Sequence, residues 1–211
     1  MAKITLTYYG HACFKVASES GSILFDPYED GSVPGLKLPF NIEADTVFCS
    51  HDHHDHNARS LIRLSGKKTD FSYCELVVPH DDANGNKRGM TKMTFVKMEG
   101  LTIAHLGDIG RLPKSDEYEI LQKADIILLP CAGFYTVDSL QAKEIIEHLK
   151  NPSLKVLMHF REGATGYEVQ EDIDHVMSVI PEVHRVQDTS IEIDTEAVPN
   201  ETITLQPCQK R

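Results

Sequence analysis

Residues 46–57, TVFCSHDHHDHN, constrain the possible folds of this chain more than any other stretch. Four residues of buried-strand character, TVFC, lead through Ser50 into HDHHDH, which holds four histidines and two aspartates. So many ionisable side chains do not fill a hydrophobic core. In α/β proteins, binding and catalytic residues usually follow the end of an apolar strand. The stretch therefore predicts an α/β fold with its functional site at the end of this strand.

The spacing of the polar residues indicates a metal site. On an extended chain His51, His53 and Asp55 point to one side, whereas Asp55 and His56 point apart, so the chain must turn there if both face one centre. Imidazole with carboxylate suits zinc, iron or manganese, and the thiolates of a structural zinc site are missing. The alternative is a surface histidine cluster that binds metal adventitiously, which a position directly after a strand disfavours. Asn57 is a candidate N-cap for a helix over 58–64 that stops at Gly66.

Composition narrows the class of partner. The 211 residues suit a single domain, 1–211, and carry 32 acidic against 21 basic side chains, a net charge of −11. Nucleic-acid and anionic-membrane binders need a basic face, so we expect neither partner and expect a small-molecule substrate, although a local basic pocket is compatible with this charge. No apolar run approaches membrane length and no signal sequence is evident, so we expect a cytoplasmic protein whose oligomeric state the sequence leaves open.

The cysteines are predicted to be free thiols. They are five in number, scattered and never in a C-x-x-C pair, which argues against a disulfide framework and against a cysteine zinc site.

The N-terminal segments 4–8, 13–16 and 22–25 are predicted strands. The third ends at Asp26-Pro27, where the carboxylate can support a metal ligand of the neighbouring site. His11 has two equal interpretations, a residue of the site or a hydrogen-bonding residue at a turn. Segment 27–45, with three prolines and two glycines, is irregular; we interpret it as a loop that covers substrate, with an exposed connection as the alternative.

Three later strands each end in a polar residue: 75–79 leads to His80, 101–105 to Gly107-Asp108, and 155–158 to His159. The glycine before Asp108 lets the backbone approach a site closely. His105, inside its strand, is expected to pack or hydrogen-bond behind the site. The remaining expected elements are helices over 115–123, 139–150 and 167–180, and strands over 91–96, 125–130, 183–187, 190–194 and 202–206.

Three cations are candidates for contact with an anionic substrate. Lys87 and Arg88 lie in a turn-rich loop over 81–89, where solvated charges are the alternative. Arg161 follows His159 and can hold an anionic group by a charge-assisted bond, or can pair with an acidic neighbour such as Glu162.

The pattern His51-x-His53-x-Asp55-His56 resembles the signature of the metallo-β-lactamase superfamily. The resemblance extends over most of the chain, through Gly10-His11, Asp26-Pro27, His80, Gly107-Asp108, the turn at 130–135 and His159, and is closest to the short metal-dependent hydrolases related to ascorbate-6-phosphate lactonase. It implies a four-layer αβ/βα sandwich with a dinuclear site between the two sheets. Ile109 stands where the family often has threonine, which removes a hydroxyl beside the site.

Carried over residue by residue, the resemblance implies two ligand sets. His51, His53 and His80 hold one metal. Asp55, His56 and His159 hold the other, and Asp108 bridges both. One or two divalent ions per chain are expected, zinc first, with manganese or iron as alternatives.

Such a centre implies hydrolysis by a metal-activated water. Two adjacent cations lower the pKa of a bridging water and polarise the oxygen under attack. Asp55 or Asp108 then orients the hydroxide and accepts its proton. The expected substrate is a lactone, ester or amide of a small molecule, phosphorylated or not. The alternatives are a phosphodiesterase or nuclease, which the acidic charge disfavours, and a non-hydrolytic di-iron or metal-binding module, which the lack of a flavin domain disfavours.

Overall fold

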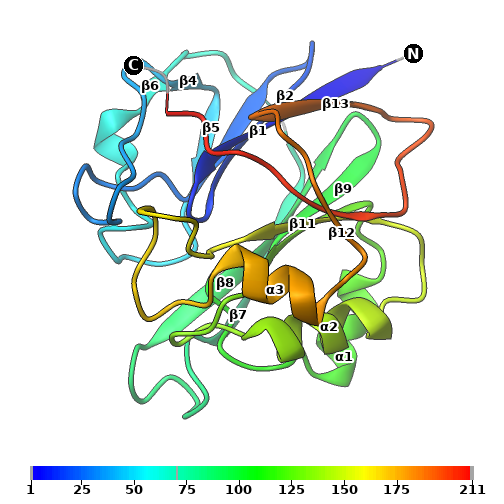
Figure 1. Ribbon diagram of the computed structural model, residues 1–211. Coiled ribbons are helices and arrows are strands. Elements are labelled where there is room, and N and C mark those ends of the chain that lie inside the picture. The colour runs from blue at the N-terminus through cyan, green and yellow to red at the C-terminus, as the bar shows by residue number, and fades with distance from the viewer. Residues whose placement is uncertain (1, 70, 210–211) are drawn as a thin grey trace.

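The computed structural model describes residues 2–69 and 71–209, and two β-sheets pack against each other in it, with three helices outside one of them (Figure 1). One hydrophobic core lies between the sheets: Phe14 and Phe25 of the N-terminal sheet join Leu128 and Val156 of the other in a single buried cluster. Since both sheets bury a face in this core, their polar ends meet at one edge of the sandwich.

The N-terminal sheet has five strands in the order β13-β1-β2-β3-β5. Their bounds are β1 Lys3–Gly10, β2 Cys13–Ala17, β3 Ser22–Phe25, β5 Thr46–Phe48 and β13 Ser190–Asp194. Burial alternates along β1, as expected for a strand with one face in the core. β3 and β5 are parallel, so Asp26 and the histidine motif leave the sheet at the same end.

The second sheet has seven strands in the order β12-β14-β11-β10-β9-β8-β7. Their bounds are β7 Tyr73–Pro79, β8 Met90–Met98, β9 Leu101–His105, β10 Ile126–Pro130, β11 Leu154–Met158, β12 Val183–Arg185 and β14 Thr202–Thr204. β9, β10 and β11 are parallel, and the antiparallel β8 returns the chain so that β7 runs in the same direction. The residues after β7, β9 and β11 therefore reach one edge.

Helices α1 Ser115–Leu121, α2 Ser139–His148 and α3 Ile173–Val179 cover the outer face of the second sheet (Figure 1). The helix expected over 167–180 begins only at Ile173, because Asp172 caps it: the Asp172 side chain accepts a hydrogen bond from the backbone N–H of Asp174. The helix expected over 139–150 ends at His148 and begins with a capping box between Asp138 and Gln141.

The helix predicted over 58–64 is wrong. A single 3-10 turn, Arg59–Leu61, is followed by the short strand β6, Arg63–Leu64, which pairs with β4, Glu43–Ala44. Asn57 does not cap a helix, because its side chain contacts Asp52 and Arg59 instead. Ile62, between the turn and the strand, is the one buried residue of 59–64, so a helix there would have no apolar face to bury.

Segment 27–45 packs on the outer face of the N-terminal sheet, so it is not an exposed connection. Its apolar side chains form a second buried cluster with Cys13 and Leu24 of that sheet: Tyr28, Val33, Leu36, Leu38 and Ile42. The outer layer on this side is therefore irregular chain rather than α-helix, while the sandwich of two sheets is as expected. A role of this loop in covering substrate stays a prediction.

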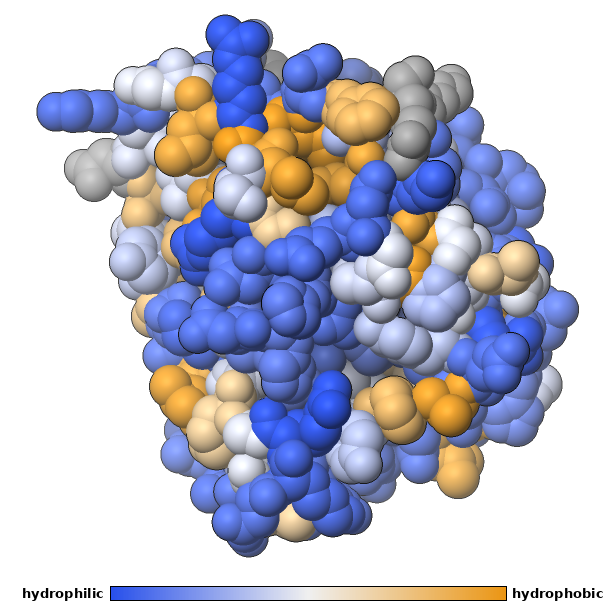
Figure 2. All heavy atoms as spheres, turned by 90° about the vertical axis from the view of Figure 1, so that its left-hand side faces the viewer, coloured by the Kyte–Doolittle hydropathy of each residue, from blue (hydrophilic) through white to orange (hydrophobic). Residues whose placement is uncertain are grey.

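The side of the molecule that carries these loops is mostly hydrophilic in its central band, and hydrophobic side chains gather at its top (Figure 2). Exposed apolar residues of this region include Phe40, Leu61 and Leu64. All five cysteines are free, as predicted. Within residues 2–69 and 71–209, the helices are all too short or too polar to span a bilayer.

Candidate metal centre

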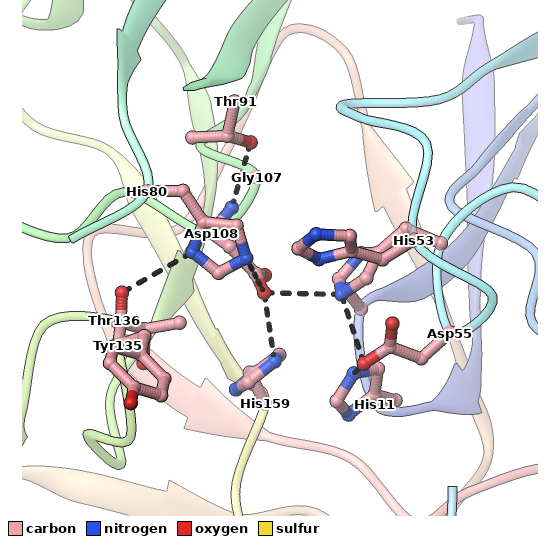
Figure 3. Close-up of polar contacts among 12 residues, drawn as sticks. His11, His53, Asp55, His80, Thr91, Gly107, Asp108, Tyr135, Thr136 and His159 are labelled. Carbon is pink, nitrogen blue, oxygen red and sulfur yellow. Dashed lines mark hydrogen bonds and ion pairs between the residues drawn. The ribbon is translucent and has the colours of Figure 1, made fainter. Parts of the chain in front are cut away.

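The seven residues predicted as metal ligands lie together at the edge between the sheets. Figure 3 labels His53, Asp55, His80, Asp108 and His159 among them. Together with His11, their potential ligand atoms form three overlapping groups, each with all atoms within 4.8 Å of one another. The groups are His51, His53 and His80; His51, His56 and Asp108; and His11, Asp55, His56 and His159. Because His51 and His56 each belong to two groups, the three groups form one continuous set of potential metal ligands.

Asp108 occupies the middle of the cluster. Its Oδ2 lies 3.1 Å from His56 Nε2, 3.2 Å from His159 Nε2 and 3.4 Å from His80 Nε2. Burial alone would raise the pKa of Asp108, but the imidazoles of His159 and His56 hold the pKa well below its usual range. Asp108 is therefore a carboxylate that faces histidines from both sheets.

The approach of Asp108 depends on the glycine before it. Gly107 has a φ of +55°, and a Cβ at this position would lie 2.6 Å from the carbonyl oxygen of Lys92. The Asp108 backbone N–H donates to Thr91 Oγ1 over 3.2 Å. The prediction that Gly107 permits a close backbone approach is confirmed.

Three imidazole rings are oriented by acceptors behind them. His51 Nδ1 lies 2.9 Å from Ser50 Oγ, His56 Nδ1 lies 2.8 Å from Asp26 Oδ2, and His80 Nδ1 lies 3.3 Å from the carbonyl oxygen of Tyr135. When Nδ1–H donates to these oxygens, Nε2 keeps its lone pair and faces the centre. This arrangement prepares each ring to bind a cation.

Asp26 links two of these rings. It accepts hydrogen bonds from the Ser50 backbone N–H at 2.7 Å and from Ser50 Oγ at 2.6 Å, besides its contact with His56. Asp26 has a φ of 42°, so it holds a left-handed backbone conformation that is rare for a residue other than glycine. The structure places Asp26 behind the predicted ligands, in the position expected for supporting them.

His105 also lies behind the site. Its Nε2 is 2.8 Å from the carbonyl oxygen of Ala12, and its Nδ1 accepts a hydrogen bond from the Gly107 N–H at 3.1 Å. The ring stacks on Phe25, with centroids 4.9 Å apart. His105 therefore fixes the start of the Gly107-Asp108 turn and does not face the centre.

His11, which the sequence left with two interpretations, is part of the cluster. Its side chain is fully buried, and its Nε2 lies 3.2 Å from Asp55 Oδ2. Its carbonyl oxygen accepts hydrogen bonds from Tyr8 Oη at 3.0 Å and from the His159 N–H at 2.9 Å. Burial is the main cause that lowers the pKa of His11 to about 4, so the ring is neutral at pH 7. His11 holds Asp55 in place from behind.

Two residues that sequence reasoning missed complete the buried side of the cluster. Tyr167 Oη donates to Asp55 Oδ2 over 3.0 Å, and the Gln170 side-chain amide lies 2.8 Å from His159 Nδ1. Both belong to the segment expected to be helical, where no local pattern distinguishes them. Only the packing of this segment against the histidine motif shows their role.

Two histidines of the motif, His51 and His53, border an open space. His51 and His53 line a cavity of about 380 Å³ together with Arg59, Arg88 and Lys92. A separate, more apolar hollow lies beside Tyr73 and Cys74, at the opposite end of β7 from His80, and contains none of the clustered residues. Of these two hollows, the one beside His51 and His53 borders residues of the cluster.

The other candidate cations have acidic partners. Arg161 Nη2 lies 3.1 Å from Asp172 Oδ2, so its partner is Asp172 rather than Glu162. Lys87 Nζ lies 2.7 Å from Asp82 Oδ1. Contact of either residue with substrate stays a prediction.

The residues fit a metal ion. Apart from the ion-pair contacts with Asp108 Oδ2, five buried atoms of the cluster have no hydrogen-bond partner in the described chain: Nδ1 of His11, Nε2 of His56, His80 and His159, and Oδ1 of Asp108. An unsatisfied buried polar atom costs about 1–3 kcal/mol, and a bound cation would satisfy several of them at once. The donors are nitrogen and oxygen only, the set that zinc, manganese and iron accept. The cluster is thus able to bind metal.

Comparison with known proteins agrees with this geometry. The family model described as Beta-lactamase superfamily domain matches residues 5–159 of this chain. A UPF0173 metal-dependent hydrolase of Opitutus terrae is 30% identical over 197 residues, covering 74% of this chain and 84% of the relative. One from Sulfolobus acidocaldarius is 26% identical over 189 residues, covering 74% and 83%.

Solved structures share the fold. A Thermotoga maritima protein assigned to the zinc-dependent hydrolases of the metallo-β-lactamase superfamily superposes with a TM-score of 0.71 at 22% identity, covering 96% of this chain and all of the other. Igni18, a metallo hydrolase of Ignicoccus hospitalis, superposes with a TM-score of 0.66 at 17% identity, covering 91% of this chain and 99% of the other. With its fold, its cluster and its relatives in agreement, this chain belongs to the metallo-β-lactamase superfamily and is a metal-dependent hydrolase of that superfamily.

Proposed function

We propose that the chain binds two divalent ions, zinc first among the candidates, and hydrolyses a lactone, ester or amide bond in a small molecule. The observation that carries this proposal is the position of Asp108, whose one oxygen lies 3.1–3.4 Å from three imidazoles of the two expected ligand sets. A carboxylate shared in this way suits two adjacent cations better than one.

His51, His53 and His80 would hold one ion, and Asp55, His56 and His159 the other, with Asp108 between them. Bound metal would supply a water of lowered pKa and polarise the oxygen under attack. No serine or cysteine nucleophile is needed, and the buried cysteines are poor nucleophiles because burial raises the pKa of Cys131 and of Cys13.

Asp55 is the residue we assign to orienting the attacking water. Burial would raise its pKa, but the hydrogen bond from His11 and the charge of His56 lower it well below the usual range. Asp55 is therefore a carboxylate at all working pH values. It can accept a hydrogen bond from the water and take its proton only transiently.

The test combines metal analysis with a substrate panel. Protein purified without added metal is analysed for its elements, then assayed on a lactone, a carboxylic ester, a phosphodiester and a thioester before and after chelation. We expect close to two ions per chain and chelator-sensitive turnover of the lactone or ester. Turnover of the phosphodiester alone would replace this proposal with the nuclease alternative, and activity that survives complete metal removal would contradict it.

A further inference from the structure

Two consecutive aromatic residues beside the cluster hold an unusual backbone conformation. Phe134 and Tyr135 have φ values of 57° and 69°, directly after Gly133 at 71°. Bulky residues rarely adopt this left-handed region, and such strain concentrates at functional sites. The turn is held by hydrogen bonds from Thr136 Oγ1 to the Gly133 carbonyl oxygen at 2.7 Å and from the Gly133 N–H to the Val137 carbonyl oxygen at 3.1 Å.

The strain does not serve to bury the two rings. Phe134 is 43% exposed and Tyr135 is 38% exposed. Their ring centroids lie 5.0 Å apart, and the Phe134 ring lies 6.2 Å from that of Tyr167. Apolar rings that a strained turn presents to solvent are available for contact with another molecule.

The row of rings lies beside the cluster. The carbonyl oxygen of Tyr135 contacts His80 Nδ1, and Figure 3 shows the Tyr135 ring below His80, on the same side of Asp108. At the other end, Tyr167 hydrogen-bonds to Asp55. The row of aromatic rings therefore extends from the Asp55 side of the cluster to the His80 side.

Arg88 adds a positive charge to this row. Its guanidinium carbon lies 5.0 Å from the centroid of the Tyr135 ring, and the residue lines the cavity beside His51 and His53.

Arg88 differs from its neighbours in having no acidic partner. Across residues 2–69 and 71–209, no carboxylate lies within ion-pair distance of its guanidinium, whereas Lys87 pairs with Asp82 and Lys92 with Glu75. Arg59, on the same cavity, already donates to Asn57 Oδ1 and to the Val47 carbonyl oxygen. In a chain with a net charge of −11, an arginine without a carboxylate beside a cavity is free to bind an external anion.

The backbone of the Arg88 loop is anchored independently of the arginine side chain. The buried Asp81 carboxylate accepts four backbone hydrogen bonds of 2.7–2.9 Å, from the N–H groups of Ala83, Gly85, Lys87 and Arg88. A substitution of the Arg88 side chain should therefore leave the loop in place.

We propose that Phe134, Tyr135 and Arg88 form a substrate-binding rim that selects small molecules with an anionic group next to an apolar or ring-shaped portion. The anion is a carboxylate or a phosphate, both of which match the planar guanidinium. This inference rests on the proposed hydrolase function of the same site and names its class of substrate.

The test measures binding, so that it does not depend on turnover. Metal-loaded protein is titrated by calorimetry with phenylphosphonate, benzoate and inorganic phosphate. The variants are Arg88→Gln, Arg88→Lys and Phe134→Ala, with Lys87→Gln as the matched control one residue away. Direct contacts of a probe with the metals are common to all variants, so the differences between variants report the rim alone.

We expect Arg88→Gln to weaken the binding of phenylphosphonate about tenfold or more, which is the loss typical of one charge-assisted hydrogen bond. Arg88→Lys should recover part of this affinity. Phe134→Ala should weaken the binding of phenylphosphonate roughly threefold or more but leave the affinity for inorganic phosphate unchanged, because phosphate has no ring. Lys87→Gln should change neither. A stronger effect of Arg88→Gln on benzoate than on phenylphosphonate would identify a carboxylate as the anion.

Equal affinities of Arg88→Gln and Lys87→Gln for all three probes would overturn the proposal. Metal content, measured on each variant, keeps this outcome separate from a damaged metal site. If no lactone or ester is hydrolysed but the Arg88 and Phe134 effects appear, the proposed reaction fails while the anionic rim stands.

Discussion

The two sides of the metal centre are built differently. On one side, the side chains of His11, His56 and His159 are at most 3% exposed, and that of Asp55 is 14% exposed. On the other, His51 and His53 are only half-buried and border the cavity that Arg88 also lines, whereas His80 is buried. The first side is enclosed by protein, and two of the three histidines of the second side border an open cavity.

This difference assigns separate tasks to the two sides. The enclosed side has its ligands held by further side chains, Asp26, Gln170 and Tyr167, so any displacement breaks buried hydrogen bonds. On the open side, Ser50 holds His51 and the Tyr135 carbonyl oxygen holds His80, while the half-buried His53 can change its contacts at lower cost. We infer that the enclosed side keeps the geometry of the centre and that the open side exchanges ligands.

The largest expected effect comes from Asp108, the residue that contacts both sides. Asp108→Ala removes the shared carboxylate, so it should lower metal content and reduce turnover by roughly 100-fold or more through misplacement of the attacking water. Elemental analysis and kinetics of the purified variant measure both effects.

The control is Asp52→Ala, which removes a neighbouring exposed carboxylate whose partner is Asn57. It should keep its metal and activity. An Asp108→Ala protein with two ions and full hydrolytic activity would show that the two sides do not share this ligand.

Asp26→Ala should separate support of the centre from general stability. The change leaves buried donors of Ser50 and His56 without an acceptor, so the free energy of unfolding should fall by about 4 kcal/mol. Chemical denaturation of the metal-free protein measures this loss, and metal affinity should fall with it.

Asp45→Ala is the matched comparison at the opposite end of the same strands, where Asp45 accepts hydrogen bonds from Ser22. It should cost less stability and leave metal affinity unchanged. An equal loss of metal in both variants would mean that Asp26 does not act on the centre specifically.

The metal-free protein should lose stability as the pH falls. Burial is the first cause that lowers the pKa of His11 to about 4 and that of His51 to about 3 in the folded state. In the unfolded chain these histidines bind protons near pH 6.5, whereas in the folded state they do so only near pH 4 or below. The free energy of unfolding therefore falls as the pH is lowered from 6.5 to 4. His11 contributes about 3 kcal/mol to this loss of stability.

Opposite behaviour is expected of His56. Burial would lower its pKa, but Asp108 and Asp26 raise it well above the usual value, so its contribution is present below pH 6.5 and is lost only at higher pH. Urea unfolding of the metal-free wild type and of His11→Gln at pH 4.5 and 7 measures the His11 share. A His11→Gln protein with the same pH dependence as wild type would refute it.

The smallest effect concerns exchange of the ions. If the enclosed side holds its ion more firmly, chelation should remove metal in two phases, the slower about tenfold slower than the faster, since supporting contacts of this kind are typically worth tenfold or more in metal affinity. Tyr167→Phe removes one support of Asp55 and should speed only the slow phase. A single phase for the wild-type protein, at full two-ion loading, would remove the distinction between the sides.

Much of the centre was predictable because its residues follow the ends of strands. His80, Asp108 and His159 are isolated in sequence, but each follows an apolar strand, and parallel strands bring their ends to one edge of a sheet. The region after Asn57 was not predictable in the same way. The weak helical pattern there predicted a helix, but residues 63–64 form β6, which pairs with β4. The Asn57 side chain forms hydrogen bonds with Asp52 and Arg59 instead of capping a helix.

The sequence by itself determined an α/β chain with polar residues of nitrogen-and-oxygen chemistry at its strand ends, because strand periodicity and polar strand ends are local properties of the chain. The sandwich of two sheets and the complete set of ligands were expected from the resemblance of these motifs to the metallo-β-lactamase superfamily. The tertiary structure alone decided which side of the centre is enclosed. Tyr167 meets Asp55 across 112 positions and His11 meets it across 44, and no local spacing encodes such contacts. They arise only when the two sheets pack, since burial in the shared core holds these side chains against one another.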